Sequence, residues 1–168
     1  MSVEDGDRAV ANVLGALALG VSDRLAASSD AAALITLLER GQLTIEWLRR
    51  IIGLSHSASV RLVDRLAAER LVQRHAGPDR RSVSVQLTGH GRRIARQLRS
   101  EREAQLAKLV EPLTHAERTT LGAIADKLAT RLVAGRWDAR LVCRLCDHAA
   151  CAAAGGCPLD RAASRLGE

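Results

Sequence analysis

The sequence predicts a mainly α-helical fold that contains one small β-hairpin. Apolar residues recur at helical spacing through most of the first 134 residues, which predicts a series of amphipathic helices. Between Leu71 and Leu87 the pattern changes to alternation around a turn-forming segment, as in two strands joined by a loop. A chain of 168 residues holds enough apolar material to bury a core without disulfide bonds.

The first predicted helix runs from about Asp7 to Ala27. Its apolar stripe consists of Val10, Val13, Leu14, Leu17, Val21 and Leu25. Gly15 and Gly20 lie inside this helix and lower its intrinsic stability. We therefore expect it to depend on packing against another element, with a partner subunit as one candidate.

Two shorter helices follow. Ser28 and Ser29 offer N-caps for a helix from about Asp30 to Glu39, and Gly41 stands where that helix should end. A third helix begins after its cap Thr44 and stops at Gly53.

A fourth helix starts almost at once, with Ser55 as its cap. Its inward positions are Val60, Val63, Leu66 and Ala67, and its other face carries Ser57, Ser59, Arg61 and Arg65. A helix, a short turn with glycine, and a second helix with a polar and basic outer face form the sequence pattern of a helix-turn-helix.

The hairpin and two further helices complete the regular part of the chain. Leu71 to Arg74 and Ser82 to Leu87 predict the two strands, and the turn between them carries arginines at its tip. A long helix runs from Thr88 to about Val110. Thr114, with a glutamate three residues later, forms a capping box for the last helix.

Composition narrows the classes of function. The chain has two tryptophans and no phenylalanine or tyrosine, so it offers almost no aromatic platform for stacking the bases of single-stranded nucleic acid. Its 25 basic and 19 acidic residues give a formal charge of +6, which favours a polyanionic partner. The sequence shows no nucleophile–base pair and no phosphate-binding loop, so we expect no enzymatic activity.

The sequence also indicates where the protein works. No stretch approaches the roughly 18 to 20 apolar residues of a membrane span. The N-terminal segment carries Glu4, Asp5 and Asp7 instead of a basic region before an apolar run, so no secretory signal is expected. We expect a cytoplasmic protein with no membrane partner.

One segment resembles a known family. Residues Leu54 to Thr88 read LSHSASVRLVDRLAAERLVQRHAGPDRRSVSVQLT, which is similar to the MarR family of winged helix-turn-helix transcriptional regulators. The resemblance rests on the helix LSHSASVRLVDRL, the strand LVQR, the hairpin motif DRR and the closing LT. It covers about Asp7 to Val133. It implies a domain at residues 1–134 with a DNA-binding lobe at about 30–88.

Members of that family are homodimers held by their first and last helices. Their recognition helices enter successive major grooves of duplex DNA, and their hairpin wings reach the flanking minor grooves. The resemblance therefore implies a homodimeric, sequence-specific regulator of transcription, most often a repressor. Many relatives bind a small-molecule effector between the dimer and DNA-binding regions, although no residue here identifies one. The apolar terminal helices support a dimer, because a monomer would leave that surface exposed.

The resemblance also implies individual contacts for the recognition helix. Ser55 would cap the helix, whose amide end would face a phosphate. Ser57, Ser59 and Arg61 would face the groove. Arg65 would lie near the phosphate backbone.

The wing carries further implied contacts and one departure from the family. Arg81 would enter the minor groove, Arg80 would add a phosphate contact, and Asp79 would hold the tip. The family usually has glycine where this chain has Arg70. A non-glycine residue tolerates a left-handed turn poorly, so we expect the path from helix to strand to differ slightly.

Residues 135–168 lie outside the resemblance and are predicted to be a metal-binding tail appended to the helical body. All the cysteines of the chain stand here in the spacing C-x2-C-x4-C-x5-C, as Cys143, Cys146, Cys151 and Cys157. In a reducing compartment such a group favours a metal centre over disulfides. An iron–sulfur cluster is slightly preferred to zinc because Pro158 follows the last cysteine, although the spacing matches neither type of site. His148 is an alternative ligand.

Two functions for this tail remain open at the level of sequence. A centre attached to the last dimer helix would set the angle between two DNA-reading lobes. An iron–sulfur cluster would then report oxidant or iron supply, whereas zinc would brace the dimer. The alternative is a small redox or electron-transfer metalloprotein in which the helices only hold the cysteine centre. Such a protein has no need of a basic hairpin after a helix-turn-helix, so the hairpin distinguishes the two.

Overall fold

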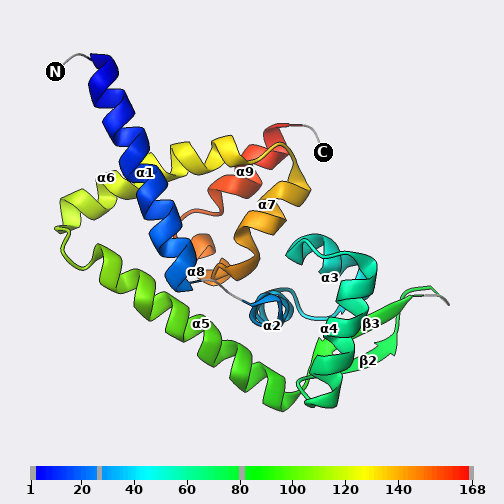
Figure 1. Cartoon of the computed structure of the whole chain (residues 1–168). Coiled ribbons are helices and arrows are strands. Elements are labelled where there is room, and N and C mark those ends of the chain that lie inside the picture. The colour runs from blue at the N-terminus through cyan, green and yellow to red at the C-terminus, as the bar shows by residue number, and fades with distance from the viewer. Residues whose placement is uncertain (1–2, 26–27, 80–81, 167–168) are drawn as a thin grey trace.

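The computed structural model describes residues 3–25, 28–79 and 82–166, which form an open helical molecule with a small sheet at one end (Figure 1). The helices are α1 (Val3–Leu25), α2 (Ser29–Arg40), α3 (Ile45–Ile52), α4 (His56–Ala68), α5 (Gly89–Val110), α6 (His115–Ala129), α7 (Arg136–Val142), α8 (His148–Ala153) and α9 (Pro158–Arg165), with the 3-10 turns η1 (Thr130–Leu132) and η2 (Cys143–Leu145). The strands are β1 (Leu43–Thr44), β2 (Val72–Ala76) and β3 (Val83–Leu87). The predicted mainly α-helical winged helix-turn-helix is confirmed.

The sheet is antiparallel, with the strand order β1-β3-β2. Val72 pairs with Leu87 across the predicted hairpin, which is thereby confirmed. Leu43 pairs with Val85 and adds the short strand β1 to the other edge of β3. The sequence did not predict β1, because two residues are too few to show an alternating pattern.

An apolar core lies between α2, α3, α4 and the sheet, and α5 closes it. We call this part, residues 28–79 and 82–98, the winged lobe. Its buried side chains come from the inward faces that helix and strand spacing predict. They include Leu34, Leu37, Leu48, Leu62, Val63, Leu66, Val85 and Leu87.

The caps predicted at Ser28, Thr44, Ser55 and Thr114 are confirmed, and Thr88, predicted as the start of a helix, is also a cap. Each cap hydroxyl accepts a hydrogen bond from the backbone N–H three residues later, which satisfies one of the free donors at the start of a helix. These pairs are Ser28 with Ala31 (3.1 Å), Thr44 with Trp47 (3.1 Å), Ser55 with Ala58 (3.3 Å), Thr88 with Gly91 (3.0 Å) and Thr114 with Glu117 (3.3 Å). Glu117 also returns a hydrogen bond to the Thr114 backbone N–H, so the capping box is complete.

The end of α4 corrects one expectation. Arg70 adopts a φ of 57°, the left-handed conformation that glycine usually supplies. The N–H of Leu71 donates to the carbonyl of Leu66 at 2.9 Å, as at the end of a glycine-terminated helix. The chain therefore keeps the sharp turn and accepts the strain of a left-handed non-glycine residue, on the order of 1 kcal/mol.

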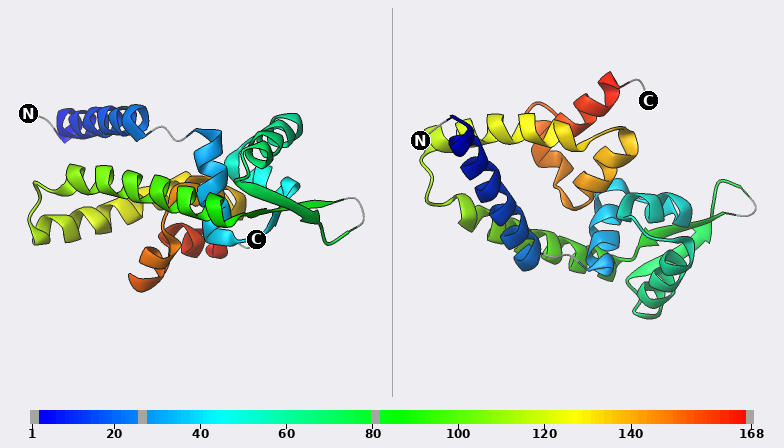
Figure 2. Two further views of the ribbon diagram at one scale, coloured as in Figure 1. Left: turned by 90° about the horizontal axis from the view of Figure 1, so that it is seen from below. Right: turned by 45° about the horizontal axis from the view of Figure 1, so that its top comes forward.

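The terminal helices leave the winged lobe. α5 runs away from it, and a short link sends α6 back at an angle (Figure 1). Figure 2 shows α1 as a separate layer beside them. No helix in the described part of the chain combines the length and the apolarity of a bilayer span.

The cysteine tail differs most from its prediction as an appendage. Residues 136–165 form α7, α8 and α9, which fold back into the space between α6 and the winged lobe (Figure 1). α7 packs on α3, η2 packs on α2, and α9 packs on α7, α6 and η1. The tail is therefore part of the helical body. Its helices escaped prediction because they have only seven, six and eight residues, which is too short for a helical repeat to stand out in the sequence.

Candidate functional site

Helix α4 presents a polar face to solvent at the outer side of the winged lobe. Ser55 and Ser57 stand exposed at its start, with their hydroxyl oxygens 3.4 Å apart. Arg61 is exposed one turn later and has no hydrogen-bond or ion-pair partner among the residues described. A free guanidinium beside a serine-rich helix start is suited to contact phosphates and base edges of a duplex.

Ser59 does not belong to this face, which corrects its predicted role in the groove. Its exposed fraction is 0%, and its hydroxyl donates to the backbone carbonyl of His56 at 2.7 Å. The buried hydroxyl is thus satisfied within its own helix. Ser59 was misplaced because its small polar side chain reads as an exposed one, while helical spacing puts it on the same inward face as Leu62 and Val63.

Two ion pairs tie α4 to its surroundings. The guanidinium of Arg65 forms a fork with the carboxylate of Asp30 at the start of α2, with Nε to Oδ2 at 3.1 Å. This pairing raises the pKa of Arg65. Arg65 remains exposed, and its ion pair with Asp30 holds α4 against α2. Asp64 pairs with Arg74 of β2 and fixes the helix against the hairpin.

The hairpin that follows projects beyond the sheet (Figure 2). Arg80 and Arg81, the predicted DNA contacts of the wing, lie outside the described residues. Below them, Ser82 closes the loop: its backbone N–H and its hydroxyl both donate to the carbonyl of Asp79 at 3.2 Å. A Cβ at Gly77 would lie 2.0 Å from the Ser82 hydroxyl, so the turn requires glycine there.

A hollow of about 580 Å³ separates α4 from the wing. Its lining includes His56, Asp64, Arg74, Asp79 and Ser82. His56, at the exposed start of α4, belongs to this lining. We call α4 together with the wing the candidate nucleic-acid interface.

The terminal helices carry apolar side chains that no other described part of the chain covers. Helix α6 buries none of its residues. Leu17 of α1 is 56% exposed, and Ile124 of α6 is 48% exposed. Both line an apolar groove of about 600 Å³ between α1, the end of α5 and α6. Solvent-exposed stripes of this kind mark an interaction surface.

The tail brings its thiols into one neighbourhood. The Sγ atoms of Cys143 and Cys157 are 3.6 Å apart, and Cys143 also forms a hydrogen bond with Cys146. That bond lowers the pKa of Cys146 to about 7, with help from the positive charge of Arg102. The same bond, together with burial, raises the pKa of Cys143. Burial and the nearby thiols also raise the pKa of Cys151.

These thiols do not yet form a ready metal site. Within residues 3–25, 28–79 and 82–166, no three Cys, His, Asp or Glu side chains are arranged to hold a metal ion. Cys143 is buried, Cys146 is exposed, and Cys151 and Cys157 are intermediate. The sulfur chemistry nevertheless fits a soft or borderline metal, since four thiolates are a common ligand set for both zinc and iron–sulfur centres.

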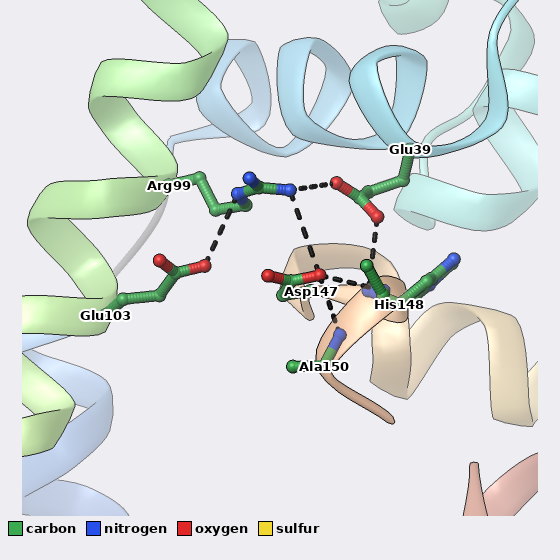
Figure 3. Close-up of polar contacts among 7 residues, drawn as sticks. Glu39, Arg99, Glu103, Asp147, His148 and Ala150 are labelled. Atoms are coloured by element: carbon green, nitrogen blue, oxygen red, sulfur yellow. Dashed lines mark hydrogen bonds and ion pairs between the residues drawn. The ribbon is translucent and has the colours of Figure 1, made fainter. Parts of the chain in front are cut away.

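A polar cluster fastens the tail to α2 and α5 (Figure 3). The carboxylate of Glu39, only 9% exposed, accepts from Arg99 of α5 at 2.5 Å and from the backbone N–H of His148 at 3.1 Å. Arg99 also lies 3.9 Å from Asp147 and 3.3 Å from Glu103. Asp147 caps α8 by accepting from the N–H groups that follow it. The imidazole of His148 points away from this cluster (Figure 3).

A second contact joins α7 to α3. Trp47 and Trp137, the two aromatic residues of the chain, lie against each other with their ring centroids 4.9 Å apart and their planes tilted by 51°. Arg50 lies over the Trp137 ring at 4.1 Å, and Arg140 lies over the Trp47 ring at 4.8 Å. Each helix thus supplies one tryptophan and, one turn later, one arginine. Sequence analysis missed this contact, although the scarcity of aromatic residues was a signal that both have a specific place.

Comparison with known proteins finds similarity to one family. A sequence model of the MarR family matches residues 19–82. The chain is similar to the structure of a MarR family protein from Bacillus stearothermophilus, with 25% identity and a TM-score of 0.66 over 78% of this chain and 98% of that one. It is also similar to the YusO protein of Bacillus subtilis (22%, TM-score 0.64, 77% and 98%) and to RV1404 of Mycobacterium tuberculosis (26%, TM-score 0.60, 77% and 93%). A search of proteins with curated functions found no sequence match.

The family match agrees with the residues and the fold. The matched segment contains the helix-turn-helix and the first hairpin strand, β2, and it ends just before β3. Members of the family are transcription regulators and not enzymes, which disfavours the electron-transfer alternative. Residues 19–82 thus match the model of the MarR family of transcription regulators, the chain shares the winged helix-turn-helix fold of solved MarR family proteins, and it carries an additional four-cysteine tail.

Proposed function

We propose that this chain is a homodimeric repressor that binds a specific operator sequence in duplex DNA. The observation that carries the proposal is the outward face of α4, with its exposed Ser55, Ser57 and unpaired Arg61, beside a hairpin wing. In winged helix-turn-helix proteins such a helix reads base edges in the major groove. Arg80 and Arg81 would add contacts at the edge of the site, with the backbone of Asp79 closing the loop below them.

The homodimer rests on the uncovered faces of α1, α5 and α6. A helix that buries no residue within its own protomer gains stability only from a partner. The groove between these helices is apolar and belongs to elements at the end remote from α4 (Figure 1). A second copy of the chain would cover it and leave both recognition helices outward, about one helical turn of DNA apart.

The second part of the proposal concerns a metal centre in the cysteine tail. The four cysteines would hold a metal centre, either zinc or an iron–sulfur cluster, and operator affinity would respond to its occupancy. Two observations support this part. The thiols of Cys146 and Cys157 both interact with that of Cys143, and the tail lies between α6 and the winged lobe.

A DNA titration tests the first part. Wild-type protein should shift a duplex from the region upstream of its own coding sequence, with an affinity that falls as salt rises. Arg61→Ala should weaken binding by about 1–3 kcal/mol. Lys108→Ala is the matched control, since it removes the same charge from an exposed position on α5 and should leave affinity near the wild-type value. If both variants lost the same DNA affinity, the loss would follow from the lower net charge alone. That result would contradict a specific role for α4.

The wing and the repressor role need separate measurements. Arg81→Ala should weaken binding and make the dependence of affinity on salt shallower. A reporter gene placed behind the bound duplex should be expressed less when the protein is present. Higher expression would identify an activator. A protein that sediments as one copy at micromolar concentration would contradict the homodimer.

A further inference from the structure

The tail has too small an apolar core to hold its own fold. Its cluster consists of Val133, Ala139, Cys143, Leu159 and Ala163. Two of these five residues are alanines, and the helices that they join, α7 and α9, are each eight residues or shorter. Segments with so little buried surface are usually stabilised by disulfides or a metal.

The four cysteines lie in the short helices of the tail or at their ends. Cys143 ends α7, and Cys157 caps the start of α9. Cys146 follows the turn η2, whose N–H to carbonyl bond joins Cys146 to Cys143 at 3.0 Å. Cys151 lies in α8. A single ion bound by all four would tie α7, η2, α8 and α9 together.

No three Cys, His, Asp or Glu side chains of the described residues form a ready metal site, but one pair of thiols stands at a separation that suits zinc better than a four-iron cluster. Tetrahedral zinc with Zn–S bonds of about 2.3 Å places its sulfurs about 3.8 Å apart, close to the 3.6 Å between Cys143 and Cys157. A four-iron cluster puts each thiolate on a different iron and holds the sulfurs further apart. The Cys-Pro sequence that favoured iron–sulfur has a local cause, because Pro158 is the first residue of α9, a position that proline prefers.

The tail contacts both the winged lobe and α6, which α5 also links along the chain. At one end α9 packs on α6, where Arg161 lies 4.0 Å from Asp126. At the other end α7 packs on α3 through the Trp47 and Trp137 rings. Between these ends the Glu39 cluster holds the segment around Asp147 against α2.

We infer that the four tail cysteines bind one zinc ion, and that the zinc-loaded tail is a strut that fixes the winged lobe relative to helix α6. Zinc binding would displace the thiol protons to solvent and leave four thiolates on the ion. The guanidinium groups of Arg102 and Arg144 lie near Cys146 and would offset the negative charge of the site. Because α6 is a dimer helix in the proposed function, the strut would set the spacing of the two recognition helices. This regulatory consequence rests on the proposed function, whereas the zinc site does not.

Metal analysis of the full-length protein tests the site. Protein purified without chelators should contain one zinc per chain and no inorganic sulfide, and cobalt substitution should give the charge-transfer absorption of a thiolate site. Cys157→Ser should lose the metal. Ala152→Ser, which adds the same hydroxyl at an exposed neighbouring position in α8, should keep it. A brown protein with iron and sulfide, or a chain that binds no metal, would overturn the proposal.

Tryptophan fluorescence tests the strut without DNA. Because Trp47 and Trp137 lie against each other across the α3–α7 contact, removing zinc from the wild-type protein with a strong chelator should change the emission spectrum, and added zinc should restore it. Wild-type protein is used here so that no folding defect of a cysteine variant can mimic the result. Emission that is identical with and without zinc would overturn the strut.

Operator affinity tests the regulatory arm. Chelation should weaken binding on the order of tenfold, a typical size for coupling between sites, and zinc should reverse the loss. Equal affinity of the two forms would overturn the coupling. If neither form binds any duplex from the upstream region, the proposed function fails, while metal content and fluorescence still decide the zinc site and the strut.

Discussion

The winged lobe and the cysteine tail of the same chain are stabilised in different ways. The lobe buries a continuous set of large side chains, and Leu48 and Leu66 are 0% exposed. The tail buries only one leucine, Leu159, and depends on contacts at its borders. These contacts are the Glu39 cluster, the tryptophan pair and the meeting thiols. Apolar burial therefore fixes the winged lobe by itself, whereas the tail needs contacts with other elements to keep its place.

The largest expected effect on stability comes from a core substitution in the winged lobe, compared with a core substitution in the tail. Leu48→Ala should lower the free energy of unfolding by about 2–5 kcal/mol, because it leaves a cavity in the lobe. Leu159→Ala is its counterpart in the tail and should leave the main unfolding transition in urea unchanged. Circular dichroism during urea titration measures both. An equal shift for the two variants would show that lobe and tail unfold as one unit.

A second test concerns the joint between the lobe and α5. A Cβ at Gly91 would lie 1.9 Å from the backbone carbonyl oxygen of Leu71, so Gly91→Ala should cost about 1–3 kcal/mol through overpacking. Gly89, in the same helix, has nothing within 4 Å of the corresponding position. Gly89→Ala should therefore be neutral or slightly stabilising. Thermal unfolding of both variants decides the point, and a harmless Gly91→Ala would contradict the packing described here.

A third test addresses the contact between tail and lobe. Glu39→Gln keeps the shape of the side chain but removes the charge that holds Arg99 and the backbone of His148. We expect a loss of about 1–2 kcal/mol, in the range for a hydrogen bond to a charged group. Glu103→Gln removes an exposed partner of the same arginine and should cost about 0.5 kcal/mol or less. If the two variants lost similar free energies of unfolding, Glu39 would contribute no more to stability than an exposed partner of Arg99.

The smallest effect has the opposite sign. Arg70→Gly should raise the free energy of unfolding by about 1 kcal/mol, because glycine adopts the left-handed conformation at φ 57° without strain. Arg70→Ala keeps a Cβ and should bring no such gain. A stability for Arg70→Gly at or below that of the wild-type protein would show that the arginine contributes contacts that offset its backbone strain.

Sequence reasoning succeeded where local chemistry decides the structure. The caps Ser55 and Thr88 and the alternating strand Val83–Leu87 each depend on neighbours within a few residues. Ser59 failed because residue type was given more weight than position: a serine was read as exposed, although it lies one turn before Leu62 on the buried face.

Contacts between distant segments could not be predicted in this way. Arg65 finds Asp30 across 35 positions, and Glu39 finds the backbone of His148 across 109. Nothing in the sequence near either residue encodes its partner. The tail was predicted as an appendage for the same reason, because its place depends on α2, α3 and α6 and not on its own apolar pattern.

Hydrogen exchange with and without zinc tests most directly whether lobe and tail are separate units joined by contacts. Zinc-loaded protein should protect the amides of α7 and α9 as well as those of α4 and β3. After chelation, exchange should become fast in residues 136–165 and rise in α3, while α4 and β3 keep their protection. A uniform rise over the whole chain, or no change anywhere, would contradict this account.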